Sequence, residues 1–233
     1  FLVLGSTPLA DRLLTQEQLD APEPRVPLEV VFCPHCTLVQ ITETVHPAVL
    51  FGGDYPYFSS VSPSLLAHFR ASALHLLESR QLGPDTLVVE AASNDGYMLV
   101  NFAERGVPVL GIDPARDPAR AAQARGIPTI NTFFTVELAR QLRADGKSAD
   151  VFLANNVLAH VADLNGFVEG IATLLEQAGV AFGKNALRFA SRSTFVQALL
   201  DLLQLAAQVG VRAALVDDVV EGEVVLRHRE HVQ

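Results

Sequence analysis

A strand, a tight loop and the start of a helix follow one another in the middle of the chain. The apolar run Leu87–Val89 ends in an acid, Glu90, and the small residues 91–96 lead from it into a helical pattern. A second apolar run, 107–112, also ends in an acid, Asp113. In a βαβ unit both acids lie at the carboxyl ends of neighbouring parallel strands, where open α/β sheets bind their ligands. The pattern therefore predicts an α/β sheet with a ligand site at this edge.

Strand and helix patterns alternate from residue 86 onward. We expect strands near 86–91, 108–113, 127–131, 149–154 and 179–183, and helices near 96–105, 117–125, 135–145 and 163–177. This alternation is typical of a doubly wound, mostly parallel sheet. A long apolar helix at 194–209 and strands at 211–216 and 223–229 complete the chain. A closing antiparallel pair of strands favours the class I methyltransferase sheet over the sheet of NAD-binding Rossmann domains.

The composition excludes several kinds of partner. Hydrophobic residues make up 49% of the 233 residues and charged residues 18%, which is typical of a globular protein. The net charge of −9, with no basic stripe, argues against a nucleic-acid partner. No apolar run approaches the roughly 20 residues that a membrane helix needs, and the opening Phe1–Leu4 is too short for a signal peptide. Two cysteines do not form a disulfide framework, so we expect a cytoplasmic location.

The first 57 residues differ from the rest and are expected to form a separate N-terminal region, with a second domain over 58–233. Short strand-like runs at 28–32 and 38–41 flank the sequence Cys33-Pro34-His35-Cys36. Two strands joined by a C-x-x-C turn indicate a zinc-ribbon knuckle, which needs four ligands. This region supplies Cys33 and Cys36, with His35 or His46 as further candidates. A tight hairpin with two buried thiols explains the same spacing equally well.

Aromatic and hydroxyl residues are concentrated in the run Tyr55-Pro56-Tyr57-Phe58-Ser59-Ser60-Val61-Ser62. One interpretation is a linker that its aromatic rings pack against the core, and the other is a segment that reaches into the cofactor cleft. Ser62 and Pro63 are a helix start, and Gly83-Pro84 ends that helix.

The loop after the first strand lacks the glycine pattern of dinucleotide-binding proteins. Ala92, Asn94 and Gly96 occupy alternate positions, and only the last is a glycine. A pyrophosphate requires close backbone approach at several points, which Asn94 would impede. A cofactor without phosphate, such as S-adenosylmethionine, needs only a compact turn and a few hydrogen bonds, while Asp113 is placed to bind a ribose. A structural βαβ unit with an empty crevice is the alternative.

Polar residues also follow the next two strands. Phe133, after the third strand, is a candidate to stack on an adenine ring or else a core residue. Asn155 and Asn156 follow the fourth strand and require hydrogen-bond partners if they are buried. His160, a few residues on, is either a structural histidine or a general acid or base.

These residues resemble the S-adenosylmethionine-dependent sugar C-methyltransferases of deoxysugar biosynthesis, a family found in antibiotic pathways. The matching pieces run collinearly over residues 6 to about 180: Pro8–Ala10, Cys33–Cys36, Tyr55–Ser62 with His68, Val89–Gly96, Leu110–Ala115 and Ala154–Asn165. The resemblance implies an N-terminal zinc-binding region followed by a class I methyltransferase domain, and a nucleotide-linked keto-deoxysugar as the small-molecule substrate. It implies His160 and one of Tyr55 and Tyr57 as the catalytic residues.

The cofactor-binding set follows from the strand ends and the resemblance together. It consists of Tyr57, Ser60, Glu90, Ala92, Ser93, Asn94, Gly96, Asp113, Pro114, Phe133, Asn155 and Asn156. The chain departs from the family in three ways, and is expected to be a truncated member. No second C-x-x-C pair is present, the loop 183–191 has no His, Tyr or Glu where the family has a loop rich in all three, and a large C-terminal domain is missing.

We therefore expect a C-methyltransferase that alkylates the carbon next to a carbonyl group. The first alternative is a protein that keeps the cofactor site without transferring methyl. The second alternative, an NAD-dependent oxidoreductase, is disfavoured by the absent glycine pattern.

Overall fold

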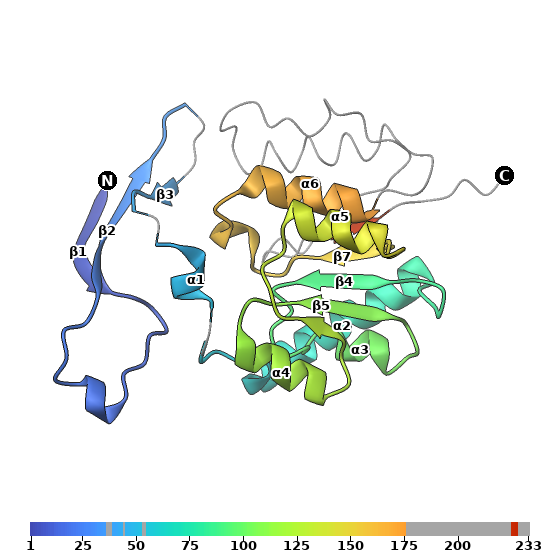
Figure 1. Cartoon of the computed structure of the whole chain (residues 1–233). Coiled ribbons are helices and arrows are strands. Elements are labelled where there is room, and N and C mark those ends of the chain that lie inside the picture. Colours follow the sequence, from blue (N-terminus) through green and yellow to red (C-terminus); the bar gives the residue numbers. More distant parts are fainter. Residues whose placement is uncertain (36–38, 44, 53–54, 176–224, 228–233) are drawn as a thin grey trace.

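The computed structural model describes residues 1–35, 39–43, 45–52, 55–175 and 225–227. Its centre is a five-stranded sheet in the order β6-β5-β4-β7-β8 (Figure 1). The strands are β4 (Val88–Ala91), β5 (Val109–Ile112), β6 (Thr129–Ile130), β7 (Val151–Leu153) and β8 (Val225–Arg227). The strands β4, β5, β6 and β7 are parallel to one another, and β8 pairs with β7 in the antiparallel direction. The predicted α/β fold class, with an antiparallel last strand, is confirmed.

Helices cover both faces of the central sheet (Figure 1). One face carries α5 (Val136–Ala144) and α6 (Leu164–Leu175); the other carries α2 (Pro63–Arg80), α3 (Val100–Ala103) and α4 (Arg116–Ala124). Alternate residues of a strand point to opposite faces. Val89 and Ala91 accordingly join the apolar cluster under α5 and α6, whereas Val88 joins the cluster under α2 and α3. The sheet is thus buried on both faces, so a ligand can contact it only at its edges and at the ends of its strands.

The helix α3 is shorter than the sequence predicts, because a side chain competes with its backbone hydrogen bonds. We expected a helix over 96–105, but only Val100–Ala103 is regular. The Asn101 side-chain Nδ2 donates to the carbonyl oxygens of Tyr97 and Met98 at 3.2 and 3.1 Å. The Asn101 backbone N–H bonds only three residues back, to Met98. An asparagine that satisfies nearby carbonyls in this way loosens the first turn.

The ends of α2 and α6 follow local sequence signals. The Ser62 side chain accepts a hydrogen bond from the Leu65 N–H at 3.3 Å and starts α2, as predicted. The helix ends at Gln81, in the left-handed conformation with φ of 52°, before the predicted stop at Gly83. The Asp163 side chain accepts from the Gly166 N–H at 3.0 Å at the start of α6.

Asp117 lies in the first turn of α4 rather than before it. The elements expected at 179–183, 194–209 and 211–216 lie outside the described residues.

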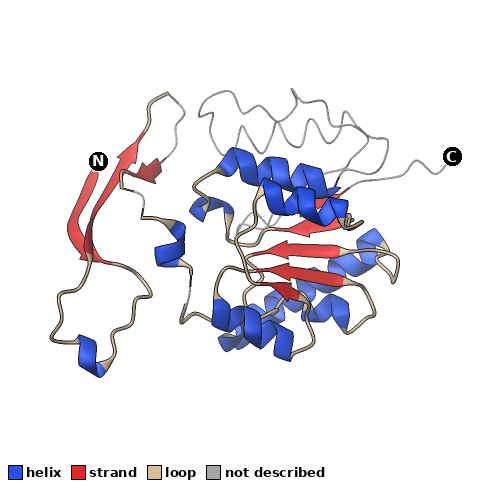
Figure 2. Cartoon of the chain, viewed as in Figure 1, coloured by secondary structure: helices blue, strands red, loops and turns tan. Residues whose placement is uncertain are grey.

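A second, smaller sheet lies apart from the central one (Figure 2). Its antiparallel strands are β1 (Leu2–Pro8), β2 (Arg25–Phe32) and β3 (Val39–Ile41), and the short helix α1 (Pro47–Leu50) leads from it to the larger domain. The structure confirms the two predicted strands on either side of the C-x-x-C segment, whereas β1 was not predicted. Cys36 lies outside the described residues, within which no three metal-binding side chains come together. Nor does any helix there have the length and apolar character to cross a membrane.

Candidate functional site

A cavity of about 820 Å³ opens at the carboxyl ends of β4, β5 and β7. Loops that follow these strands form its floor, and residues from the N-terminal region and the segment before α2 form one wall. Ten of the predicted site residues line it: Tyr55, Tyr57, Ala92, Asn94, Asp113, Pro114, Phe133, Asn155, Asn156 and His160. Four others, Ser60, Glu90, Ser93 and Gly96, do not. Strand-end reasoning therefore located the cavity, and the contacts below explain the four exceptions.

Asp113, at the end of β5, is a buried carboxylate held by two loops. Its Oδ2 accepts a hydrogen bond from the Asn94 N–H at 2.7 Å, and its Oδ1 accepts one from the Ala115 N–H at 2.8 Å. Only 4% of the residue is exposed, yet it lines the cavity. Burial raises the pKa of Asp113, and the two backbone hydrogen bonds oppose that rise. Each oxygen keeps a second lone pair with which to accept a hydrogen bond from a ligand hydroxyl.

Glu90, at the end of β4, lies beneath the cavity wall. It is fully buried, and its Oε1 accepts a hydrogen bond at 2.9 Å from the Nδ2 of Asn155, which follows β7. This bond fixes the orientation of the Asn155 amide. The Asn155 Oδ1 is then left without a hydrogen-bond partner among the described residues, although the residue is 95% buried and lines the cavity. A buried amide oxygen in this state is suited to accept from a bound ligand.

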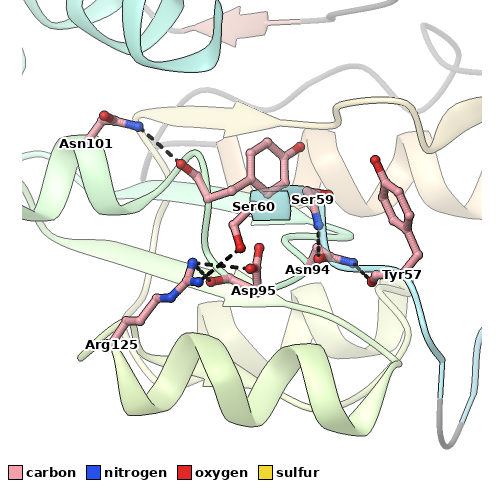
Figure 3. Close-up of polar contacts among 8 residues, drawn as sticks. Tyr57, Ser59, Ser60, Asn94, Asp95, Asn101 and Arg125 are labelled. Atoms are coloured by element: carbon pink, nitrogen blue, oxygen red, sulfur yellow. Dashed lines mark hydrogen bonds and ion pairs between the residues drawn. The ribbon is translucent and has the colours of Figure 1, made fainter. Parts of the chain in front are cut away.

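The side chain of Asn94 forms hydrogen bonds within the protein. The residue is in the left-handed conformation, with φ of 48°, which asparagine tolerates better than most residues. Its Oδ1 accepts from the Ser59 N–H at 2.9 Å, and its Nδ2 donates to the Tyr57 carbonyl at 3.1 Å (Figure 3). The amide thus binds the backbone of the segment before α2, and its N–H serves Asp113. This segment is therefore tied to the loop after β4 through its backbone, and its Tyr55, Tyr57 and Ser59 line the cavity.

Ser93 and Gly96 serve packing within the sheet and its helices. The Ser93 side chain lies over Gly111 of β5, where an added Cβ would come within 2.5 Å of the Ser93 Oγ. Gly96 has a φ of 76°, and a Cβ there would approach Ile127 at 3.1 Å and Ala122 at 3.3 Å. The loop after β4 therefore needs small residues for close approach.

The end of the cavity near the N-terminal region is aromatic. Phe51 makes edge-on contacts with His160, at 5.5 Å between ring centroids, and with Tyr55, at 5.9 Å. The Tyr55 hydroxyl donates to the Asp11 Oδ2 at 3.3 Å. Burial, followed by the nearby charge and hydrogen bond of Asp11, raises the pKa of Tyr55 to about 12. A phenol with this pKa keeps its proton at neutral pH, so Tyr55 is suited to donate hydrogen bonds and not to act as a base.

Sequence reasoning missed Phe51 and considered His46 only as a further metal ligand. The His46 Nδ1 accepts from the Ala48 N–H at 3.2 Å, caps α1 and lines the cavity. No periodic pattern marks these positions, because they lie in a short irregular stretch whose place depends on tertiary contacts. Of the Phe133-Phe134 pair, Phe134 also packs in the core against Phe152 and Phe167.

A parallel sheet with helices on both faces, an antiparallel last strand and a cavity at the ends of its first strands together define a class I methyltransferase domain. Residues 89–181 match a family model described as "Methyltransferase domain", and residues 1–51 match one described as "Putative zinc binding domain". The chain thus carries, in this order, a region that matches a zinc-binding domain and a region that matches a methyltransferase domain. The resemblance found in the sequence is confirmed.

Relatives of known name agree with this assignment. The chain is 36% identical over 178 residues to the C-methyltransferase NovU of Streptomyces niveus, a match that covers 76% of this chain and 42% of that protein. It is 30% identical over 129 residues to a ubiquinone biosynthesis O-methyltransferase of a Methylobacterium species, covering 52% of this chain and 51% of that protein. The chain thus spans about half the length of these relatives, or less.

One similar solved structure is a magnesium protoporphyrin IX methyltransferase from Synechocystis with bound SAH. It is 16% identical, with a TM-score of 0.46, and the match covers 69% of this chain and 80% of that one. A likeness this weak supports no conclusion about the present chain.

Proposed function

We propose that this chain is an S-adenosylmethionine-dependent C-methyltransferase. The observation that carries the proposal is Asp113, a buried carboxylate at the end of β5 that lines the cavity beside the loop after β4. The residues present fit the cofactor: Asp113 offers acceptors for a ribose diol, the Asn155 Oδ1 offers a buried acceptor, and Phe133 offers an apolar face. Tyr57 forms part of the wall over them. The name of NovU supports carbon as the atom that is methylated.

The chemistry uses the aromatic end of the cavity. Bound S-adenosylmethionine supplies an electrophilic methyl group. The substrate is a small molecule with a carbonyl group, which makes the hydrogen on the neighbouring carbon acidic. His160 takes that proton, and a tyrosine hydroxyl donates a hydrogen bond to the oxygen that gains negative charge: that of Tyr57, or that of Tyr55 once it turns from Asp11 to the substrate. The carbon that loses this proton would accept the methyl group that bound S-adenosylmethionine supplies, with S-adenosylhomocysteine as the leaving product.

The proposed substrate class is a nucleotide-linked keto-deoxysugar of secondary metabolism, in a cytoplasmic setting. The collinear motifs shared with the sugar C-methyltransferases that the sequence resembles support this class. A zinc ion held by Cys33 and Cys36 belongs to the same proposal, and the match of residues 1–51 to a zinc-binding domain supports it.

Two experiments, done one after the other, test the proposed function. Calorimetric titration with S-adenosylhomocysteine is expected to show binding to one site. Transfer of a labelled methyl group from S-adenosylmethionine to a keto-deoxysugar nucleotide is expected next, with His160→Ala as the inactive control. Absence of binding at millimolar ligand, with and without the sugar nucleotide, would contradict the proposal.

A second function, cofactor binding without methyl transfer, is favoured by one observation. The sequence of residues 183–191 has no His, Tyr or Glu to supply further acid–base groups. Binding of S-adenosylhomocysteine together with no transfer to any of a panel of keto-sugar nucleotides would select this function instead.

A further inference from the structure

The segment Tyr57–Ser60, here called the strap, crosses the loop after β4 and carries Tyr57 into the cavity wall. Its inner attachment is the Asn94 amide, which bonds the strap backbone on both sides of Phe58. Both of these bonds are short enough to fix the backbone of Tyr57 and Ser59. The strap therefore has one buried anchor, close to the cavity.

Its outer attachment is Arg125, which follows the last turn of α4. The Arg125 Nη2 donates to the Ser60 Oγ at 3.0 Å, between residues that are 65 positions apart in the sequence. The Arg125 Nη1 donates to the Asp95 carbonyl at 3.1 Å and lies 3.2 Å from the Asp95 Oδ2 (Figure 3). One guanidinium group thus holds the strap and the loop after β4 together.

The burial of Asp95 explains why an arginine is needed here. The Asp95 side chain is fully buried, and a buried carboxylate is destabilising unless an opposite charge lies close to it. The planar guanidinium has donors in a fixed fork, so the arm that faces Asp95 sets the direction of the arm that faces Ser60. A lysine ammonium has no such fixed geometry. The Arg125 side chain is 43% exposed, so this bond to the strap lies at the surface.

We propose that Arg125 is a positioning residue, which locks the strap through Ser60 and thereby holds Tyr57 in the wall of the cavity. Ser60 then acts on the cofactor site through Arg125 and not by direct contact, which agrees with its absence from the cavity lining. The consequence for cofactor affinity rests on the proposed function, whereas the consequence for the strap does not.

A double-mutant cycle with two readouts tests this role. The variants are Ser60→Ala, Arg125→Met and their combination, and the readouts are amide exchange over residues 57–62 without ligand and the Kd for S-adenosylhomocysteine. Ser60→Ala keeps the Arg125–Asp95 ion pair, so it isolates the strap contact without endangering the fold. Loss of one such hydrogen bond is expected to speed strap exchange and weaken the ligand about fivefold to tenfold. In the Arg125→Met background, Ser60→Ala is expected to have no further effect.

Two further variants separate positioning from charge and from stability. Arg120→Met removes the same charge from α4 at a side chain that is 70% exposed, and is expected to change neither readout. Arg125→Lys keeps a charge beside Asp95, so it is expected to restore the melting temperature lost in Arg125→Met but not the protection of the strap.

Wild-type exchange of residues 57–62 in both single variants would overturn the proposal. So would an undiminished effect of Ser60→Ala on affinity in the Arg125→Met background, because it would show that Ser60 touches the ligand directly. If the unmodified chain binds no S-adenosylhomocysteine, the proposed function fails, and the exchange measurements alone still decide the role of Arg125.

Discussion

Replacement of Asp113 by asparagine tests the centre of the site. In the folded chain, both carboxylate oxygens of Asp113 accept backbone N–H groups, at 2.7 and 2.8 Å. Asparagine offers only one oxygen, so its NH₂ group must face one of these two donors. A buried donor left without an acceptor costs about 1–3 kcal/mol of stability. For a chain of this size that corresponds to a fall in melting temperature of about 2–12 °C.

The same replacement acts on the ligand. A ribose hydroxyl that donates to a carboxylate contributes about 1.5–3 kcal/mol, so its loss weakens S-adenosylhomocysteine about 10- to 150-fold. Asp150→Asn is the matched control, since the Asp150 Oδ2 also accepts a backbone N–H, that of Leu87, at 2.7 Å. Asp150 does not line the cavity. Asparagine keeps one oxygen for this single donor, so the control is expected to change the melting temperature little and to leave the affinity unchanged.

Calorimetry at pH 7.5 and differential scanning measurements on the three proteins provide both readouts. If the Asp113→Asn variant binds S-adenosylhomocysteine as tightly as the wild type, Asp113 has no role in the ligand site. An equal loss of affinity in Asp150→Asn would show that the effect does not require contact with the cavity.

Three further predictions concern other parts of the site. Tyr55 is expected to titrate near pH 12 by phenolate absorbance, and Asp11→Asn is expected to lower that pKa. Because folding raises the pKa of Tyr55 from 10.0 to about 12, Tyr55 stabilises the folded state fully below pH 10, and this contribution to stability is lost as the pH rises through 12. Gly111→Ala is expected to destabilise the chain by about 1–3 kcal/mol in urea unfolding, whereas Gly83→Ala, which has open space around it, changes stability by less than about 0.5 kcal/mol. Asn155→Ala is expected to weaken S-adenosylhomocysteine about tenfold in calorimetry, and unchanged affinity would rule out its amide as a ligand contact.

The sequence alone predicts the fold and the edge of the sheet that carries the site. Strand and helix periodicities are local, so β4, β5 and β7 could be located, and the parallel arrangement brings their ends together. That reasoning suffices to place Asp113, Asn155 and His160 around one cavity.

The partners of the polar side chains could not be predicted in the same way. Asn94 bonds a segment 35 and 37 residues earlier, and Glu90 bonds Asn155, 65 residues later. Such distances in sequence leave no periodic signal. Ser60 and Glu90, which were assigned to the cofactor by their position, are bonded to other parts of the protein and do not line the cavity. Whether a side chain at a strand end faces the ligand or supports a neighbour depends on these long-range contacts.

The two hydrogen bonds of the Asn94 amide have a consequence for any attempt to dissect the chain. A fragment beginning at Pro63 would retain the entire five-stranded sheet and all the helices packed on it. It would nonetheless lack Tyr55 and Tyr57, and the Asn94 side chain would face solvent. A fragment that keeps every strand of the central sheet would thus still lack part of the cavity wall.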